Sequence, residues 1–383
     1  MRQTFDTIVV GAGAMGSATA YHLARDGQHV LLLEQYAIAH TRGSSHGESR
    51  IFRYAYENPA YVRLAMQSRS LWQALETEAN EQLLRPTGGL DFADDGAYHG
   101  AVEAIGEALS GAGCQYDMLD IKTLSRRFPQ WQLGNDVLAV YSPDAGVLNA
   151  TRCVEVMVMR AVVHGVTVRD NEPVRDIFVD QDTAEVVTDA GWYQAPRLVI
   201  TAGPWSNHVL RHAGLELPLR VSQEQTVYVQ PRTSADQFLP ERFPLWIHHG
   251  EPSVYGFPIL GLPGIKLAFH ADGLFIDVAD YTQTPRPEVT ARLHAYVQRY
   301  LPAVAGEAFH PTTCLYTMTP DEDFIVDRVP GKPHVVFGAG FSGHGFKFAI
   351  GIGRALADLV QWGSTEMEIG HLHVGRFLPA DKS

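Results

Sequence analysis

Three glycines that follow directly on an apolar run give this chain its clearest chemical signal. The run covers residues 7–10, and the turn after it reads Gly11-Ala12-Gly13-Ala14-Met15-Gly16. In this spacing the first glycine permits a tight turn, the second lets a pyrophosphate approach the backbone, and the third lets a helix pack closely on a strand. Free N–H groups at the start of that helix favour the phosphates. The pattern predicts a dinucleotide clamp at Gly11, Gly13, Ala14, Met15 and Gly16.

An acidic residue completes this β-α-β pattern. A helix is expected from Ser17 to Arg25, and a second apolar strand covers residues 30–33 and ends at Glu34. A carboxylate in this place can hold both hydroxyls of a ribose and repels a 2′-phosphate. The sequence therefore favours FAD or NAD over NADP.

Two later segments repeat the theme of a buried strand that ends in small residues. The strand at 197–201 runs into a small-residue turn, and such a turn lets a flat cofactor come close. The strand at 335–337 enters a glycine-rich loop, 338–347, and a helix is expected from about 348 to 361. Further candidate cofactor contacts before the second loop are Val174, Ala202, Gly203 and Trp205.

Composition limits the possible partners and the compartment. The chain has 383 residues, a formal net charge of −13 and only three cysteines. The negative charge argues against nucleic acid and against anionic membrane surfaces. The cysteines lack the spacing of a disulfide framework or a zinc site, and no HxxxH or HExxH pairing suggests another metal. We expect a cytoplasmic protein with no metal site.

The hydrophobic patterning predicts an α/β fold, α+β overall, with two parts. Helices are expected at 60–80, near 100–112 and at 151–165, the last with Thr151 as a plausible N-cap. Residues 220–315 alternate like an antiparallel sheet, with a helix near 287–300. We expect a discontinuous dinucleotide-binding domain (1–85, 150–217 and 320–383) and a second, catalytic domain (86–149 and 218–319).

Four motifs resemble the monomeric sarcosine oxidase and N-methyltryptophan oxidase family of FAD-dependent oxidoreductases, which is D-amino-acid-oxidase-like. They are GSSHGESRIFRYAY (43–56), YGFP (255–258) followed by Lys266 and His270, CLYTMTPDEDFIVD (314–327) and GAGFSGHGFKF (338–348). The resemblance covers nearly the whole chain. It implies a Rossmann-like FAD-binding domain, a catalytic domain with a large mixed sheet, and oxidation of secondary amino acids with O2.

The resemblance also assigns roles to individual residues. It implies a thioether between Cys314 and the flavin, and a positive charge at Lys266 that helps O2 to react. Arg53 and Lys347 match the pair that binds the substrate carboxylate, and Tyr255 and Tyr316 match the aromatic residues beside the substrate amine. The remaining flavin or pocket residues that it implies are His46, Ser44, Ser49, Arg50, His270, Gly340, Ser342, Gly343, His344 and Gly345.

Taken alone, several of these residues have plainer interpretations. A single thiol is most often structural, a lysine on an alternating strand most often faces outward, and a lone histidine is more often structural than catalytic. Residues 41–50 form a polar, glycine-bearing loop, the first glycine-rich loop, and residues 338–347 form the second. Ser45 stands where sarcosine oxidases commonly have histidine, so the detailed geometry of the first glycine-rich loop stays open.

The expected activity is oxidation of a secondary, N-methyl α-amino acid such as sarcosine by a monomeric enzyme, with FAD as cofactor and H2O2 as product. Four alternatives remain. The substrate could instead be a bulkier N-methyl amino acid or a cyclic imino acid, or the enzyme could pass its electrons to an acceptor other than O2. The protein could also be an NAD-dependent amino acid dehydrogenase or a nucleotide-binding regulator. Arg53, Lys266 and Lys347 together argue against the regulator, and a yellow colour would exclude the NAD enzyme.

Overall fold

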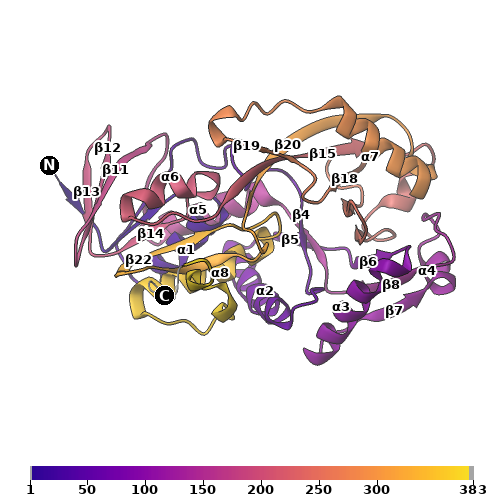
Figure 1. Cartoon of the computed structure of the whole chain (residues 1–383), viewed down its shortest axis with the longest axis horizontal. Coiled ribbons are helices and arrows are strands. Elements are labelled where there is room, and N and C mark those ends of the chain that lie inside the picture. Colours follow the sequence, from indigo (N-terminus) through magenta and orange to yellow (C-terminus); the bar gives the residue numbers. More distant parts are fainter. Residues whose placement is uncertain (1, 379–383) are drawn as a thin grey trace.

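A computed structural model describes residues 2–378 of the chain. Within this range the strands form four sheets, and no helix is long and apolar enough to cross a membrane. One sheet has six strands and another has nine. In Figure 1, β14 and β22 of the six-stranded sheet lie toward the left with α1 (Ala14–Arg25) and α8 (Ala349–Trp362). Strands β6, β7, β8 and β18 of the nine-stranded sheet lie toward the right with α3 (His99–Gly111), α4 (Ile121–Arg127) and α7 (Pro287–Tyr300). The predicted fold class is confirmed.

The six-stranded sheet carries the predicted dinucleotide clamp directly after β2 (Thr7–Val10), one of its two central strands. Its strands follow the order β10 (Thr167–Arg169), β3 (Val30–Leu33), β2 (Thr7–Val10), β14 (Leu198–Ile200), β22 (Lys332–Ala339) and β21 (Ile325–Val329). All neighbours are parallel except the β21–β22 pair. Because the sheet is covered on both faces, its central strands are continuous apolar runs.

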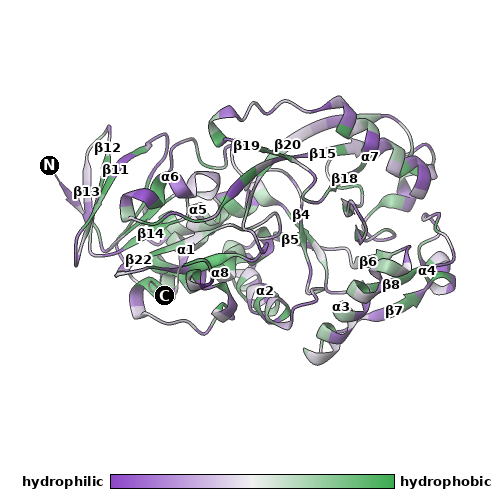
Figure 2. Ribbon diagram, in the orientation of Figure 1, coloured by the Kyte–Doolittle hydropathy of each residue, from purple (hydrophilic) through white to green (hydrophobic). Residues whose placement is uncertain are grey.

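Alternate residues of these strands enter two different cores. Val9, Leu32 and Val199 pack with α1, α8 and α5 (Ala150–Val163). Ile8, Leu31 and Ile200 point to the opposite face, where a four-stranded sheet covers them. That small sheet consists of β1 (Gln3–Thr4), β13 (Trp192–Ala195), β12 (Ala184–Thr188) and β11 (Val174–Val179). In Figure 2 the hydrophobic colour gathers on β14, β22 and α8, as this burial requires.

The nine-stranded sheet is antiparallel except for one parallel pair. The path runs β19 (Leu274–Ile276), β15 (Arg220–Val229), β18 (Ile265–Phe269), β17 (Val254–Phe257), β16 (Leu245–His248), β6 (Gly89–Ala93), β8 (Leu138–Ser142) and β7 (Asp117–Asp120), and β20 (Ala308–Met318) pairs with β15. The parallel pair is β16–β6. This sheet is therefore mixed, and it places β18 and β20 on the two opposite edges of β15.

Three short strands that are far apart in the sequence form a separate sheet. It consists of β4 (Arg50–Phe52), β9 (Gly146–Leu148) and β5 (Leu84–Pro86). After β4 the chain passes Arg53 and enters the long helix α2 (Pro59–Ala79), and the short helix α6 covers Ser206–Leu210. The first glycine-rich loop is thus anchored by β4.

Three local predictions differ from the structure. Helix α1 begins at Ala14 rather than Ser17, because the glycine turn leads into the helix without a separate loop. The N-cap of α5 is Asn149, whose side chain accepts a hydrogen bond from the Arg152 N–H, and Thr151 lies inside the helix. The short helix α4, capped by Asp120, was not expected. The domain boundaries given above stay a prediction.

Candidate active site

The first glycine turn is packed so tightly that side chains would not fit in it. Gly11 has a φ of +97°, and a Cβ on Gly16 would lie 1.8 Å from the Gly11 carbonyl oxygen and 2.5 Å from Thr201 Oγ1. Gly13 is less crowded, with Ser45 Oγ 3.3 Å from the position of its Cβ. The same hydroxyl accepts a hydrogen bond from the Ala14 N–H at 3.0 Å. Ser45 therefore joins the first glycine-rich loop to the start of α1.

We expect Gly16→Ala to disrupt this turn. The added Cβ meets backbone, which cannot rotate away, so the substitution should cost about 1–3 kcal/mol of stability and lower the flavin content of the purified protein. Gly100→Ala is the matched control, since Gly100 lies in α3 and a Cβ there meets nothing within 4 Å. That control should gain about 0.5–1 kcal/mol. Thermal unfolding and the flavin-to-protein absorbance ratio measure both effects, and equal behaviour of the two variants would contradict this account.

Glu34 stands next to the turn as a buried carboxylate. Its Oε2 accepts a hydrogen bond from the Ala12 N–H at 2.9 Å, and its Oε1 accepts one from the Tyr36 N–H at 3.0 Å. A carboxylate offers about four lone-pair sites, so the two remaining ones can accept from ribose hydroxyls. Glu34 also lines the large cavity described next.

A cavity of about 690 Å³ connects the glycine turn with both glycine-rich loops. It reaches residues of the six-stranded sheet, the nine-stranded sheet and the loop before α8. Predicted site residues that line it are Gly11, Gly13, Ala14, Met15, Glu34, Ser44, Ser49, Arg50, Arg53, Val174, Ala202, Gly203, Trp205, Tyr255, Lys266, His270, Cys314, Tyr316, Gly340, Gly343, His344, Gly345 and Lys347. Three predicted residues, Gly16, His46 and Ser342, lie outside this lining.

Lys266 points inward from β18. Its side chain is buried, lines the cavity and donates a hydrogen bond from Nζ to Ser49 Oγ at 3.1 Å. Burial, and after it the positive charge of the nearby Arg50 guanidinium, lowers the pKa of Lys266 to about 7. An anion beside this ammonium would be strongly stabilised in such a dry place.

Arg50 braces the loop that faces Lys266. Its guanidinium donates to the carbonyl oxygens of Ser44 and Ser49, at 3.0 and 2.9 Å. His46 belongs to this loop, and its Nε2 is buried without a hydrogen-bond partner among residues 2–378. Burial, together with Arg50 and Lys266, lowers the pKa of His46 to about 4, so this ring is neutral.

Arg53 and Lys347 meet in the same cavity although they come from opposite ends of the chain. Arg53 lines it from the segment after β4, and Lys347 from the segment before α8. Arg53 Nη1 donates to Asp91 Oδ1 at 2.7 Å and to the carbonyl oxygen of Ala55. Burial and the nearby Arg53 hold the pKa of Lys347 well below its usual range. A carboxylate ligand would relieve this repulsion by pairing with both cations.

Two tyrosines and a histidine form the neighbouring wall. The hydroxyls of Tyr255 and Tyr316 are 3.3 Å apart, and the His270 ring lies 5.8 Å from the ring of Tyr316. Burial raises the pKa of both phenols and lowers that of His270 to about 4. This wall therefore offers neutral rings and hydroxyls to a ligand rather than charges.

Cys314 stands on β20 opposite Glu224 of β15 and lines the cavity. Burial raises the pKa of its thiol, and Arg50 and Lys266 act in the other direction. The next residue, Leu315, accepts a hydrogen bond on its carbonyl oxygen from Ser44 Oγ at 2.6 Å. The thiol is thus held against the first glycine-rich loop.

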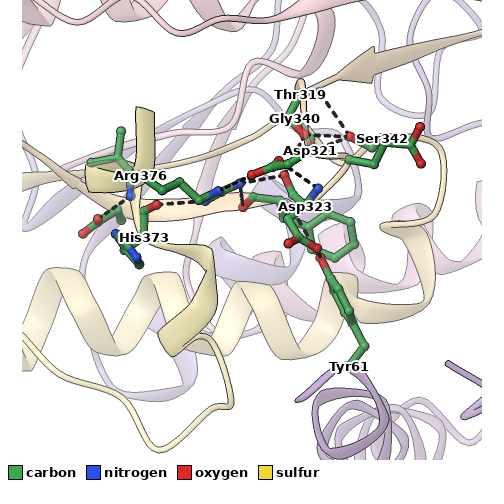
Figure 3. A network of polar contacts seen from close by, with 12 residues as sticks. Tyr61, Thr319, Asp321, Asp323, Gly340, Ser342, His373 and Arg376 are labelled. Carbon is green, nitrogen blue, oxygen red and sulfur yellow. Dashed lines mark hydrogen bonds and ion pairs between the residues drawn. The ribbon is translucent and has the colours of Figure 1, made fainter. Parts of the chain in front are cut away.

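The second glycine-rich loop needs its glycines for close approach. A Cβ on Gly340 would lie 2.4 Å from Thr319 Cγ2, and one on Gly343 would lie 2.2 Å from the Tyr316 ring. Ser342, between them, is buried and accepts a hydrogen bond from the Thr319 N–H at 3.2 Å, as Figure 3 shows. Ser342 therefore supports the loop from behind.

No site role was predicted for three residues near Arg53: Tyr56 and His249, which line the cavity, and Asp91, which pairs with Arg53. Tyr56 is the last residue of the quoted motif 43–56 and had no role assigned. Asp91 interrupts the buried run of β6, and only a partner explains a carboxylate with 1% exposure there. His249 Nε2 lies 3.1 Å from the same Asp91 Oδ1. In the sequence, the one signal for this group of residues was an acidic residue, Asp91, within the apolar run of β6.

FAD fits the residues that line this cavity. The glycine turn, the N-terminus of α1 and Glu34 offer a cradle for a dinucleotide, and Val174 and Trp205 border it. At the other end Arg50, Lys266 and the loop 340–345 surround space for a flat ring. Within residues 2–378 no cluster of three or more His, Cys, Asp or Glu side chains suits a metal ion.

Comparisons with known proteins agree with this cofactor. Residues 6–359 match the family described as FAD dependent oxidoreductase, DAO. Over 380 residues the chain is 34% identical to the monomeric sarcosine oxidase of Bacillus sp. (strain NS-129), with 98% of each chain covered. It is 29% identical over 383 residues to the N-methyl-L-tryptophan oxidase of Yersinia pestis (strain Pestoides F), with 97% of this chain and 99% of that one covered.

Among solved structures, the open form of NikD has a similar fold. NikD is described as an unusual amino acid oxidase essential for nikkomycin biosynthesis. The two structures superpose with a TM-score of 0.84 at 27% identity, and 97% of each chain is covered.

Proposed function

The chain belongs to the DAO family of FAD-dependent oxidoreductases, and we propose that it oxidises secondary α-amino acids with O2 as electron acceptor. N-methylglycine (sarcosine) is the simplest such substrate. The observation that carries the proposal is the meeting of Arg53, Lys347 and Lys266 in the cavity that also contains the glycine turn. Arg53 and Lys347 can pair with the substrate carboxylate. Lys266 can stabilise the negative charge that develops on O2 as it is reduced.

The substrate carboxylate binds between Arg53 and Lys347. Arg53 Nη1 is engaged by Asp91 and Ala55, and within the described residues its other N–H groups remain for a ligand. The guanidinium and the ammonium then hold one carboxylate from two sides. Asp91 balances part of this charge and fixes the orientation of the guanidinium.

The amine lies beside Tyr255 and Tyr316 and reacts in its neutral form. The surrounding cations repel the positive charge of a protonated substrate amine. They therefore lower the pKa of the substrate ammonium. Both phenols keep their protons, so their hydroxyls can orient the nitrogen by hydrogen bonding. When bound, FAD supplies the two-electron acceptor, and the product imine hydrolyses to an aldehyde and a primary amino acid if an N-methyl group is oxidised.

Lys266 separates an oxidase from a dehydrogenase in this proposal. A dehydrogenase does not need a cation that stabilises negative charge on O2, whereas an oxidase does. The burial of Lys266 against the cavity supports the oxidase. We further propose a covalent bond between Cys314 and the flavin. We also propose a cytoplasmic monomer, in which Cys114 and Cys153 stay free thiols, as they are in the structure.

A peroxide assay in air tests the proposed function. The panel contains sarcosine, N-methyl-L-tryptophan, L-proline and L-pipecolate, with glycine as the primary amine for comparison. We expect peroxide from at least one secondary amino acid and the highest rate to identify the substituent that the pocket accepts. If none of them yields peroxide or reduces the flavin, the proposal is wrong. Reduction without peroxide would instead support the dehydrogenase.

The carboxylate clamp gives a separate prediction. Arg53→Met and Lys347→Met each remove one charged donor, and a charge-assisted hydrogen bond contributes about 1.5–3 kcal/mol. We expect kcat/KM for the best substrate to fall about 10- to 100-fold in each variant. Lys122→Met, which alters an exposed lysine of α4, is the control. Unchanged kcat/KM in either clamp variant would remove that residue from the site.

A further inference from the structure

Tyr56 touches both cations of the proposed clamp. The guanidinium carbon of Arg53 lies 4.7 Å from the centre of the Tyr56 ring. Lys347 Nζ lies 5.1 Å from the same ring and donates a hydrogen bond to the Tyr56 hydroxyl at 2.6 Å. One aromatic side chain therefore links two cations that would otherwise only repel each other.

The neighbouring His344 has its tautomer fixed by the backbone. Its Nε2 lies 3.1 Å from the carbonyl oxygen of Glu322, which can only accept a hydrogen bond. Nε2 therefore carries a hydrogen. Burial, together with the charge of Lys347, keeps the pKa of His344 well below its usual range, so the ring is neutral and Nδ1 has a lone pair.

This tautomer orders the hydrogens as far as Lys347. The Tyr56 hydroxyl is 3.1 Å from His344 Nδ1 and must donate its hydrogen there. Burial raises the pKa of Tyr56, so that hydrogen stays on the phenol. The phenol oxygen then accepts from Lys347 Nζ, and a second Nζ hydrogen goes to the His344 carbonyl at 2.7 Å. A carboxylate bound beside Lys347 stabilises the ammonium form of its side chain, whose third hydrogen remains for the cavity that Lys347 lines.

The chain of hydrogen bonds ends at the Glu322 carbonyl, and other segments hold this end in place. Glu322 lies in the turn 319–324, which Arg376 braces by donating to Asp321 Oδ2 at 2.7 Å and to the Asp323 and Phe324 carbonyls at 2.9 and 2.8 Å. The Tyr61 hydroxyl donates to Asp323 Oδ1 at 2.8 Å. Figure 3 shows Arg376 and Tyr61 converging on this turn from the C-terminal segment and from α2.

We propose that Tyr56 is a positioning residue of the carboxylate site. The chain of hydrogen bonds from the Glu322 carbonyl through His344 and Tyr56 directs one N–H of Lys347 into the cavity, toward a carboxylate held with Arg53. This inference rests on the proposed function, because it requires that the ligand carry a carboxylate. What it adds to that function is the direction of these hydrogen bonds and the role of the Tyr56 hydroxyl in them.

The test uses the holoenzyme and acetate as the probe. Tyr56→Phe keeps the ring and removes only the hydroxyl, and Tyr54→Phe is the matched control two residues away, where no hydrogen bond of the hydroxyl is seen within residues 2–378. Calorimetric titration should show acetate binding about tenfold more weakly to Tyr56→Phe than to wild type, with Tyr54→Phe unchanged. For the best substrate, KM should rise similarly while kcat stays within about threefold.

A spectroscopic measurement tests the direction of the chain independently. In protein with ¹⁵N-labelled histidine, the His344 signals, assigned by their loss in His344→Gln, should show a protonated Nε2 and an unprotonated Nδ1. The opposite tautomer would overturn the inference, as would equal acetate affinity of wild type and Tyr56→Phe. In both cases peroxide production would be unaffected and the proposed function would stand. If wild type neither binds acetate nor oxidises a secondary amino acid, both fail.

Discussion

Lys266→Met is expected to slow the reaction of the reduced enzyme with O2 about 10²- to 10³-fold, the effect of losing one preorganised electrostatic contact to a developing anion. Reduction by the amino acid should stay within a few-fold, because Lys266 donates to Ser49 and neither Arg53 nor Lys347 is among the charges that shift its pKa. Reduction without air followed by mixing with O2 separates the two steps. Lys122→Met serves as control, and equal reoxidation rates in wild type and Lys266→Met would remove Lys266 from the oxygen reaction.

The pH dependence of that step follows from the same ammonium. Burial lowers the pKa of Lys266 to about 7, so the charge is present below this value and lost above it. Negative charge on a reduced flavin nearby would raise the pKa again. The reoxidation rate of wild type should therefore fall as pH rises through an apparent pKa of about 7 or above, and that of Lys266→Met should show no such fall.

Cys314→Ser is expected to convert a bound flavin into a releasable one. A thiolate is a far better nucleophile than a serine hydroxyl. Burial raises the pKa of the Cys314 thiol, and the positive charges of Arg50 and Lys266 offset part of this rise. After precipitation with acid, the wild-type pellet should be yellow. The Cys314→Ser pellet should be colourless, with the flavin in the supernatant.

Cys114→Ser is the control for this change, since Cys114 contacts Met66 and lies outside the cavity lining. Its pellet should stay yellow. A colourless wild-type pellet would mean that no covalent bond forms. A yellow Cys314→Ser pellet would mean that another residue carries the flavin.

The sequence predicted the parts of the site that local rules determine. Gly11, Gly16 and Glu34 have fixed places in a β-α-β unit, and their tight packing is confirmed. Which face of β18 Lys266 occupies was open, because alternation alone does not say which side of a strand is covered. The structure places it on the buried side.

The partners of the clamp were beyond sequence reasoning. Asp91 reaches Arg53 only because β6 pairs with β16 in the nine-stranded sheet, and the strand order of a sheet is not encoded in one strand. The role of Tyr56 depends on the turn around Glu322 and on Arg376, which come from distant segments. The predicted start of α5 was wrong for a local reason. Asn149 and Thr151 are both good N-cap residues, and only the folded geometry shows that Asn149 is the cap.

Anaerobic mixing of the yellow protein with its best secondary amino acid shows whether a flavin lies beside Arg53 and Lys347. We expect the visible flavin band to bleach completely and air to restore it with one peroxide per flavin. The double variant Arg53→Met/Lys347→Met should bleach at least about 100-fold more slowly at low substrate. Bleaching that is equally fast in wild type and in this double variant would contradict a flavin placed beside the carboxylate clamp.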